Sequence, residues 1–231
     1  MLLKGLQKLT LLDYPGKIAC TVFTGGCNFR CPFCHNASLV IGERLNMSET
    51  LPTEDFFAFL EKRKNRLEGV CVSGGEPTLQ PDFLSFLLDI KKMGFLVKLD
   101  TNGYRPDLLK RAVSEGLVDY VAMDIKNSKE SYGKTVGISD FDVSPICESV
   151  DFLMSGGVDF EFRTTLVKEL HSEADIISIG KWIAGAPRYF LQTFTDSGDL
   201  ICSDFGGYDK NQTEYLLNML KPTVPNAQIR G

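Results

Sequence analysis

The stretch Phe95-Leu96-Val97-Lys98-Leu99-Asp100 is typical of a β-strand with two unlike faces. Side chains alternate across a strand, so Lys98 and Asp100 share one face while the apolar residues share the other. A parallel sheet that is covered by helices on both faces carries apolar side chains on both. A strand with one charged face therefore indicates a sheet whose second face lines a polar space.

The same division recurs in the two strands predicted next along the chain. In strand 120–126, Asp124 and Lys126 lie opposite three apolar residues. In strand 158–166, Glu161 and Arg163 lie opposite two phenylalanines. Three consecutive strands with one apolar and one charged side predict a curved sheet. Its apolar side meets helices, and its polar side lines a cavity.

The rest of the chain alternates between strands and helices with short connections, which is typical of a parallel α/β sheet. We expect an incomplete (β/α)6 barrel, in a single domain over residues 1–231 that ends in a helix and tail at about 207–231. The predicted strands are 18–24, 69–73, 95–100, 120–126, 158–166 and 189–194. The predicted helices are 54–66, 81–93, 106–114, 143–154, 173–184 and 209–220, and Ser172 with Asp175 is a capping pair before the fifth of them.

Composition narrows the class of protein. The chain has 231 residues, of which 43% are hydrophobic and 24% charged, so a folded core is expected. The formal net charge of −5 argues against nucleic acid or an anionic membrane surface as the partner. No apolar run is long enough to span a bilayer. The seven cysteines, an odd number, favour a reducing cytoplasm.

Three of these cysteines fall within eight residues of the loop 25–36. Their spacing is Cys27-x3-Cys31-x2-Cys34, with no fourth cysteine nearby. A [4Fe–4S] cluster is usually held by four cysteines, so three would leave one iron open to another ligand. A zinc site completed by His35 is the alternative. It is less favourable because adjacent residues rarely reach one tetrahedral ion together.

Further polar motifs follow the other strands of the predicted barrel. The segment Gly74-Gly75-Glu76-Pro77 comes after the second strand and Asp100-Thr101-Asn102-Gly103 after the third, while Asp124-Ile125-Lys126 ends the fourth. Each segment alone could be an ordinary turn or a solvated charge pair. In parallel arrays, however, the active site gathers at the carboxyl ends of the strands. All of these motifs are therefore expected at one rim.

The chain resembles the radical S-adenosylmethionine (SAM) enzymes, and among them the glycyl-radical-enzyme activases. The resemblance rests on the three-cysteine motif with Phe33, on His35-Asn36 directly after it, and on the turn Asp13-Tyr14-Pro15-Gly16 before it. The segment from Leu6 to Gly16 is similar to activating proteins of anaerobic ribonucleoside-triphosphate reductase.

The resemblance implies a partial barrel, one [4Fe–4S] cluster and SAM. It also implies a glycyl-radical enzyme as partner, with anaerobic ribonucleotide reductase as the closest case, and flavodoxin or ferredoxin as the electron donor. One electron would cleave SAM to a 5′-deoxyadenosyl radical that abstracts a glycine hydrogen. The implied cluster ligands are Cys27, Cys31 and Cys34. The implied cofactor-binding residues are Phe33, His35, Gly74, Gly75, Glu76, Asp100, Asn102, Asp124, Lys126, Arg163 and Gln192.

Some alternatives stay open at the level of sequence. Arg163 could pair with Glu161 or with the SAM carboxylate. A small-molecule radical SAM enzyme, such as a 7-carboxy-7-deazaguanine synthase, shares the Gly-Gly-Glu-Pro region, and a non-catalytic iron–sulfur or zinc module is the rival from another class. We expect His171 at the surface or in a turn. The other cysteines are expected as buried small residues, namely Cys20, Cys71, Cys147 and Cys202.

Overall fold

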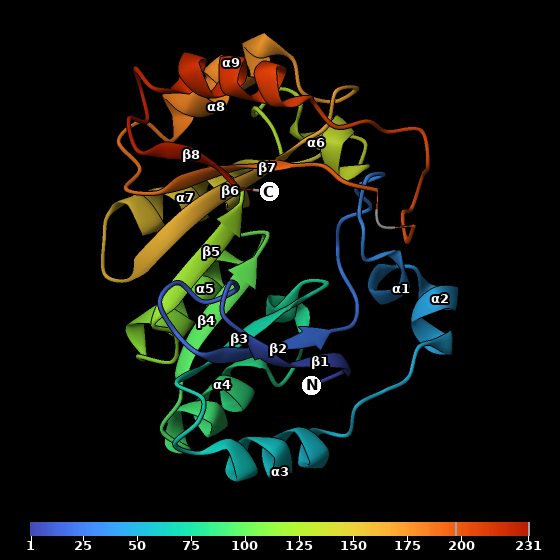
Figure 1. Ribbon diagram of the computed structural model, residues 1–231, viewed down its shortest axis with the longest axis vertical. Coiled ribbons are helices and arrows are strands. Elements are labelled where there is room, and N and C mark those ends of the chain that lie inside the picture. The colour runs from blue at the N-terminus through green and yellow to red at the C-terminus, as the bar shows by residue number, and fades with distance from the viewer. Residues whose placement is uncertain (197, 231) are drawn as a thin grey trace.

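The structure, a computed structural model, describes residues 1–196 and 198–230, which are built around one eight-stranded sheet (Figure 1). The strands lie in the sheet in their chain order. Each neighbouring pair from β2 to β8 is parallel, and β1 alone runs antiparallel to its neighbour. The strands are β1 (Leu3–Thr10), β2 (Ala19–Thr24), β3 (Gly69–Gly74), β4 (Leu96–Thr101), β5 (Tyr120–Asp124), β6 (Asp159–Leu166), β7 (Tyr189–Thr193) and β8 (Ala227–Arg230).

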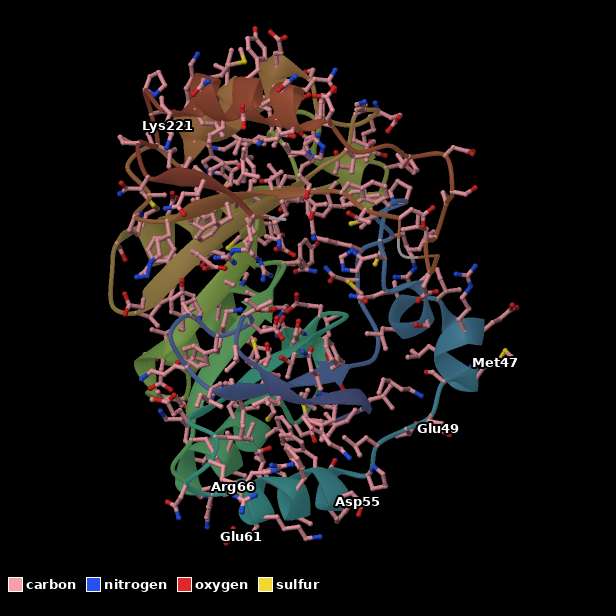
Figure 2. All side chains as sticks on the ribbon, viewed as in Figure 1. Met47, Glu49, Asp55, Glu61, Arg66 and Lys221 are labelled. Atoms are coloured by element: carbon pink, nitrogen blue, oxygen red, sulfur yellow. The ribbon has the colours of Figure 1, made fainter. Side chains whose placement is uncertain are left out.

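Helices cover the outer side of the curved sheet, and two short helices stand beside its open side (Figure 1). On the outer helix α3, the labelled Asp55 and Glu61 point away from the sheet (Figure 2). None of the helices in the described ranges is long and apolar enough to cross a membrane. The helices are α1 (Ala37–Val40), α2 (Gly42–Met47), α3 (Thr53–Arg63), α4 (Phe83–Lys92), α5 (Pro106–Ser114), α6 (Tyr132–Val136), α7 (Ser144–Met154), α8 (Glu173–Trp182) and α9 (Lys210–Leu220), with a 3-10 turn η1 (Pro77–Leu79).

The predicted incomplete (β/α)6 barrel is confirmed by this arrangement. The six predicted strands correspond to β2 to β7, and the six predicted helices to α3, α4, α5, α7, α8 and α9, with ends that agree within three residues. The prediction missed β1 and β8. Only the end residues Leu3 and Thr10 of β1 are buried, and β8 has just four residues, so neither strand carries a strong apolar pattern.

The two faces of the central strands separate as their alternation predicts. Val97 and Leu99 of β4 are fully buried in the apolar core, whereas Asp100 lines a cavity inside the barrel. Below that cavity, two charged side chains are themselves buried, with Lys98 2% exposed and Glu161 0% exposed. Buried charges need partners. Lys98 forms an ion pair with Asp100, and Glu161 accepts hydrogen bonds from Tyr120 and Arg230.

The turn between β1 and β2 closes the barrel at the end opposite the polar rim. Tyr14, 4% exposed, packs against Tyr120 at the start of β5, with ring centroids 6.0 Å apart. A Cβ atom on Gly69, the first residue of β3, would lie 2.9 Å from the Tyr14 ring. The Oγ1 of Thr21 donates to Asp13 at 2.5 Å. Asp13 and Tyr14 therefore hold this turn across the lower end of the strands.

The predicted capping pair at the start of α8 is confirmed, and it extends into a wider network. Ser172 accepts a hydrogen bond from the Asp175 N–H, and Asp175 accepts one from the Ser172 N–H in return. Asp175 also accepts hydrogen bonds from Ser128 and Ser131, which follow β5. Burial alone would raise the pKa of Asp175, but the hydrogen bonds outweigh burial and lower it to about 2.

We predict that Asp175→Asn lowers the free energy of unfolding at pH 7 by roughly 1 kcal/mol. The folded-state pKa lies below the ordinary value of 3.8, so the ionised carboxylate stabilises the fold above that value. This stabilisation is lost as the pH falls from about 4 to about 2. Urea denaturation at pH 7 and at pH 3 measures the effect. An equal difference between wild type and variant at both pH values would contradict the assignment.

Candidate functional site

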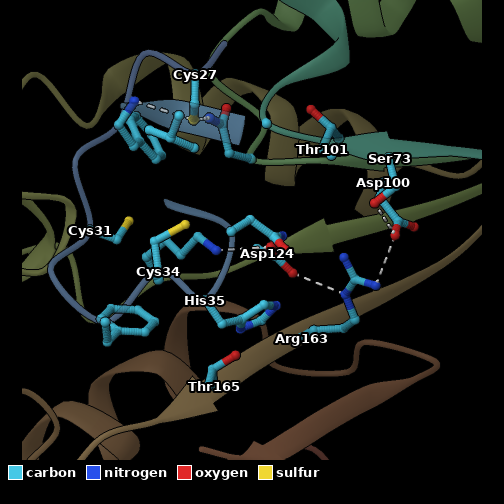
Figure 3. A pocket seen from close by; sticks show the side chains of 18 of the residues that line it. Cys27, Cys31, Cys34, His35, Ser73, Asp100, Thr101, Asp124, Arg163 and Thr165 are labelled. Atoms are coloured by element: carbon cyan, nitrogen blue, oxygen red, sulfur yellow. Dashed lines mark hydrogen bonds and ion pairs between the residues drawn. The ribbon is translucent and has the colours of Figure 1, made fainter. Parts of the chain in front are cut away.

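The loop after β2 places all three clustered cysteines on one cavity. Cys27, Cys31 and Cys34 line a cavity of about 270 Å³ that also reaches Asp124 and Arg163 (Figure 3). The loop is internally braced, since the Cys34 N–H donates to the Cys31 carbonyl at 3.0 Å. The three thiols are free. The motif therefore faces a common space.

Packing fixes this loop from two sides. On one side, Phe29 lies edge-on to Tyr104 and Phe141, with ring centroids 5.9 Å and 5.5 Å apart. On the other side, the Cys202 N–H donates to the Pro32 carbonyl at 2.8 Å, and the Ser38 N–H donates to Asp199 at 3.0 Å. The prediction that Cys202 is buried is wrong, because its place on this covering segment leaves it exposed.

The thiols fit a multi-iron cluster better than a single ion. In residues 1–196 and 198–230, no group of three or more His, Cys, Asp or Glu side chains is arranged to hold one metal ion. The cysteines of a cubane bind different irons, so they can share a cavity without meeting at one point. Burial raises the pKa of Cys27 to about 11 and that of Cys31 to about 12. Both are thus neutral thiols at pH 7 until a metal displaces their protons.

Two glycines after β3 let a second loop approach the cysteine loop closely. Gly74 has φ +115°, and a Cβ atom there would overlap the Thr24 backbone. A Cβ atom on Gly75 would overlap the Gly26 carbonyl oxygen. The Glu76 N–H donates to that same oxygen at 2.8 Å. Both positions need glycine, because the backbone of the β2 strand and the cysteine loop occupies the space that a side chain would fill.

Glu76 is fully buried and connects loops, which differs from the expectation that it contacts a cofactor. Its Oε1 accepts hydrogen bonds from the Thr78 N–H at 3.1 Å and from the Thr101 hydroxyl at 2.8 Å. Its Oε2 accepts the Asn102 N–H at 2.6 Å. Glu76 is 0% exposed and does not line the cavity. Its carboxylate therefore fixes the end of β4 relative to the loop after β3.

Charged side chains from β4, β5 and β6 form the wall opposite the cysteines (Figure 3). The Arg163 guanidinium donates to Asp124 at 2.9 Å and to Asp100 at 3.4 Å, so it bridges the two carboxylates. Lys126 pairs with the other oxygen of Asp124 at 2.9 Å. The alternative that Arg163 pairs with Glu161 is wrong, because Glu161 points to Arg230 below the cavity.

The wall is held in its ionised form. Burial would raise the pKa of Asp124, but Arg163 and Lys126 outweigh it and hold that pKa well below the ordinary range. The pKa of Asp100 is lowered in the same way, where Arg163 and Lys98 outweigh burial. Burial would lower the pKa of Lys126, yet Asp124 raises it instead. Near pH 7 the cavity is therefore lined by ionised carboxylates and cationic side chains, which suit a ligand with both positively and negatively charged groups.

The cavity brings together all but one of the implied site residues. It is lined by Phe33, His35, Gly74, Gly75, Asp100, Asn102, Asp124, Lys126, Arg163 and Gln192 in addition to the three cysteines, and Glu76 is the exception. Sequence reasoning missed Ser73 and Thr165, which also line it. Thr165 lies two residues beyond Arg163 on β6, so the same alternation of side chains could have found it.

His171 is buried, so the expectation of a surface histidine is wrong. Its side chain lies beneath the loop after β5, where Nε2 contacts the Lys126 carbonyl at 2.8 Å and Nδ1 lies 3.1 Å from the Val167 N–H. The Val167 N–H can only donate, so Nδ1 accepts, and the protonated Nε2 donates a hydrogen bond to the Lys126 carbonyl oxygen. Burial lowers the pKa of His171. A neutral imidazole therefore holds the backbone of Lys126 in place.

We predict that Gly75→Ala pushes the loop after β3 away from the cysteine loop, because the new methyl group cannot share space with the Gly26 carbonyl oxygen. We expect the variant to retain less iron per chain than wild type after anaerobic reconstitution, and to unfold at a lower temperature. Gly42→Ala is the matched control, since a Cβ atom there meets nothing within 4 Å. Equal iron content in both variants would contradict the close approach.

Comparison with known proteins agrees with this geometry. The model of the radical SAM superfamily matches residues 21–178. A Methanocaldococcus jannaschii protein named "Putative glycyl-radical enzyme activating enzyme" is 30% identical over 236 residues, which cover 99% of this chain and 95% of that protein. The pyruvate formate-lyase-activating enzyme of Streptococcus mutans is 27% identical, over 97% of this chain and 87% of that enzyme.

A solved structure shares the fold at low sequence identity. Streptococcus suis SuiB, in a crystal structure bound to SAM, superposes with a TM-score of 0.69 at 14% identity. The match covers 90% of this chain and 49% of SuiB, so this chain spans about half the length of that protein. The family to which the matched model belongs uses a [4Fe–4S] cluster and SAM. With its cysteine motif, partial barrel and matched sequence, this chain belongs to the radical SAM superfamily and is related to its glycyl-radical-enzyme activating enzymes.

Proposed function

We propose that this protein is a radical SAM activase that generates a glycyl radical on a partner enzyme. The observation that carries the proposal is that three cysteines and a wall of paired charges line one cavity at the carboxyl ends of the strands. The nearly full-length similarity to a protein named as a glycyl-radical enzyme activating enzyme supports the choice of partner class. Among such partners we favour anaerobic ribonucleoside-triphosphate reductase, because of the segment from Leu6 to Gly16.

In this proposal, Cys27, Cys31 and Cys34 hold the single [4Fe–4S] cluster. Three thiolates leave one iron without a protein ligand, and the charged wall lies across the cavity from them. When bound, the cluster and SAM supply a one-electron cleavage of the sulfonium that yields a radical able to remove a hydrogen atom. The protein contributes position and exclusion of water. Phe29 and Phe33, 2% and 4% exposed, help to shield the cysteines from solvent.

The charged wall suits the polar groups of SAM. We propose that Arg163, a planar donor between two carboxylates, also faces the SAM carboxylate, since a guanidinium binds a carboxylate through two parallel hydrogen bonds. Asp100 and Asp124 then offer oxygens to the amino group or the ribose hydroxyls of SAM. Gly74 and Gly75 line the cavity, so their backbone groups are placed to approach the methionine part of SAM. His35, Lys126 and Gln192 complete the proposed contacts from the remaining sides.

The proposal also covers the electron donor of the protein and the cellular compartment in which it works. We propose a flavodoxin or ferredoxin as the electron donor, because the chemistry needs a reductant of low potential that delivers single electrons. We also propose that the protein works in a reducing cytoplasm. The seven free cysteines support this, since none is paired in a disulfide.

The decisive experiment uses electron paramagnetic resonance of a candidate partner. Anaerobic ribonucleoside-triphosphate reductase is incubated with the reconstituted protein, SAM and a chemical reductant. We expect a glycyl-radical signal on the partner and one methionine released per radical. Cys31→Ala should abolish both, because the cluster loses a ligand. If SAM is consumed but no glycyl-radical enzyme acquires a signal, the small-molecule enzyme replaces this proposal.

We predict that Arg163→Gln raises the KM for SAM by about tenfold to a hundredfold, since a hydrogen bond to a charged group contributes about 1.5–3 kcal/mol. Iron content should stay at the wild-type level, because Arg163 lies across the cavity from the thiols. SAM cleavage at varied SAM concentration measures the change. Arg188→Gln is the control, since Arg188 pairs with the exposed Asp159 at the opposite end of β6. Equal KM values in all three proteins would contradict the assigned contact.

A further inference from the structure

Asn102 lines the cavity, but its side chain is directed to the cysteine loop. It is 5% exposed and follows directly after β4. Its backbone N–H is held by the buried Glu76 carboxylate at 2.6 Å. Its Nδ2 lies 2.8 Å from the Asn28 side-chain oxygen and 3.9 Å from the Cys27 sulfur. Glu76 thus holds the backbone of Asn102, and Asn28 holds its side-chain amide beside Cys27.

The orientation of this amide follows from its other partner. The Tyr104 N–H points at Asn102 with a donor–acceptor distance of 3.0 Å. A backbone N–H can only donate, so the atom that faces it must be the amide oxygen. The amide nitrogen then faces Asn28 and Cys27. The hydrogen-bond network thus assigns an N–H donor, and not a carbonyl oxygen, to the side nearest the sulfur.

We propose that Asn102 tunes the iron–sulfur cluster by donating a side-chain hydrogen bond to the Cys27 sulfur, which raises the reduction potential of the cluster. This inference rests on the proposed function, in which Cys27 is a cluster ligand. As a neutral thiol Cys27 is a weak acceptor, but as a thiolate it is a strong one for the same donor. Asn102 is a positioning residue in this role, since it acts through Cys27.

The expected sign follows from charge. Adding one electron makes the cluster and its thiolates more negative, so a donor at the sulfur stabilises the reduced state more than the oxidised state. Hydrogen bonds to the sulfurs are among the factors that set the potentials of such clusters. The effect is strong where solvent is excluded, and Asn102 is buried. The Phe29 N–H also donates to the Cys27 sulfur, at 3.4 Å, and this backbone donor is retained when Asn102 is substituted.

We predict that Asn102→Ala shifts the midpoint potential of the reconstituted cluster to a more negative value. The measurement is a redox titration with titanium(III) citrate, in which the signal of the reduced cluster is followed by electron paramagnetic resonance, in the absence of SAM and of any partner. Asn102→Asp should shift the midpoint further in the same direction, because it replaces the donor with a negative oxygen while it keeps an acceptor for the Tyr104 N–H.

Asn28→Ala is the matched control. It breaks the same Asn28–Asn102 hydrogen bond but leaves the amide nitrogen of Asn102 beside the sulfur. The Asn28 side-chain oxygen itself lies 3.9 Å from the Cys27 sulfur, so its loss removes a partial negative charge there, and we expect a midpoint equal to or above that of wild type. If Asn28→Ala lowers the midpoint as far as Asn102→Ala does, the hydrogen bond between the two loops sets the potential and the donor to the sulfur does not, and the inference is overturned. An unchanged midpoint in both Asn102 variants overturns it as well.

A second readout separates a tuning role from a merely structural one. Pulsed resonance of the reduced cluster in deuterated buffer detects exchangeable deuterons near the sulfurs, and Asn102→Ala should lose one of these couplings while Asn28→Ala keeps it. If wild type itself assembles no cluster, or if Cys27→Ala retains it unchanged, the proposed function fails. A normal cluster in wild type with no shift on substitution of Asn102 rejects only this inference.

Discussion

The Glu76 carboxylate is the constraint on which the geometry of the site depends. It is fully buried and accepts hydrogen bonds from three residues on two loops, Thr78, Thr101 and Asn102. Burial raises the pKa of Glu76. A buried carboxyl group is tolerable only when its oxygens have hydrogen-bond partners, so the two loops cannot separate without leaving these oxygens unsatisfied. Because Asn102 in turn bonds Asn28, the same carboxylate fixes the cysteine loop. The loop after β3, the end of β4 and the cysteine loop are thus held together through the Glu76 side chain.

A second layer of charge inside the barrel supports the first. Lys98 and Glu161 lie below the cavity, where most small barrels carry apolar side chains. Lys98 takes one oxygen of Asp100 while Ser73 and Arg163 take the other. Asp100 is therefore held on both oxygens before any ligand arrives. Little rearrangement is needed on binding, which is how preorganised polar groups contribute most.

The alternation of polar and apolar residues along three strands was enough to predict a curved sheet and the members of the charged wall. Asp124 and Arg163 were placed on the cavity side by this alternation, but the ion pair between them was not predicted. The role of Glu76 could not be predicted, since the direction of a side chain in a turn depends on backbone angles that spacing does not determine. His171 was misplaced for a similar reason. A histidine in a loop is usually exposed, but both ring nitrogens of His171 have backbone partners, the Lys126 carbonyl and the Val167 N–H, which make its burial possible.

The turn that carries Tyr14 has a consequence for the charges inside the barrel. Tyr14, itself 4% exposed, packs against Tyr120 across one end of the strands. Lys98 is 2% exposed, so its ion pair with Asp100 is kept from bulk solvent. Buried charge pairs are weakened much less by dissolved ions than exposed pairs are. The floor of the cavity should therefore keep its arrangement at low and at high ionic strength.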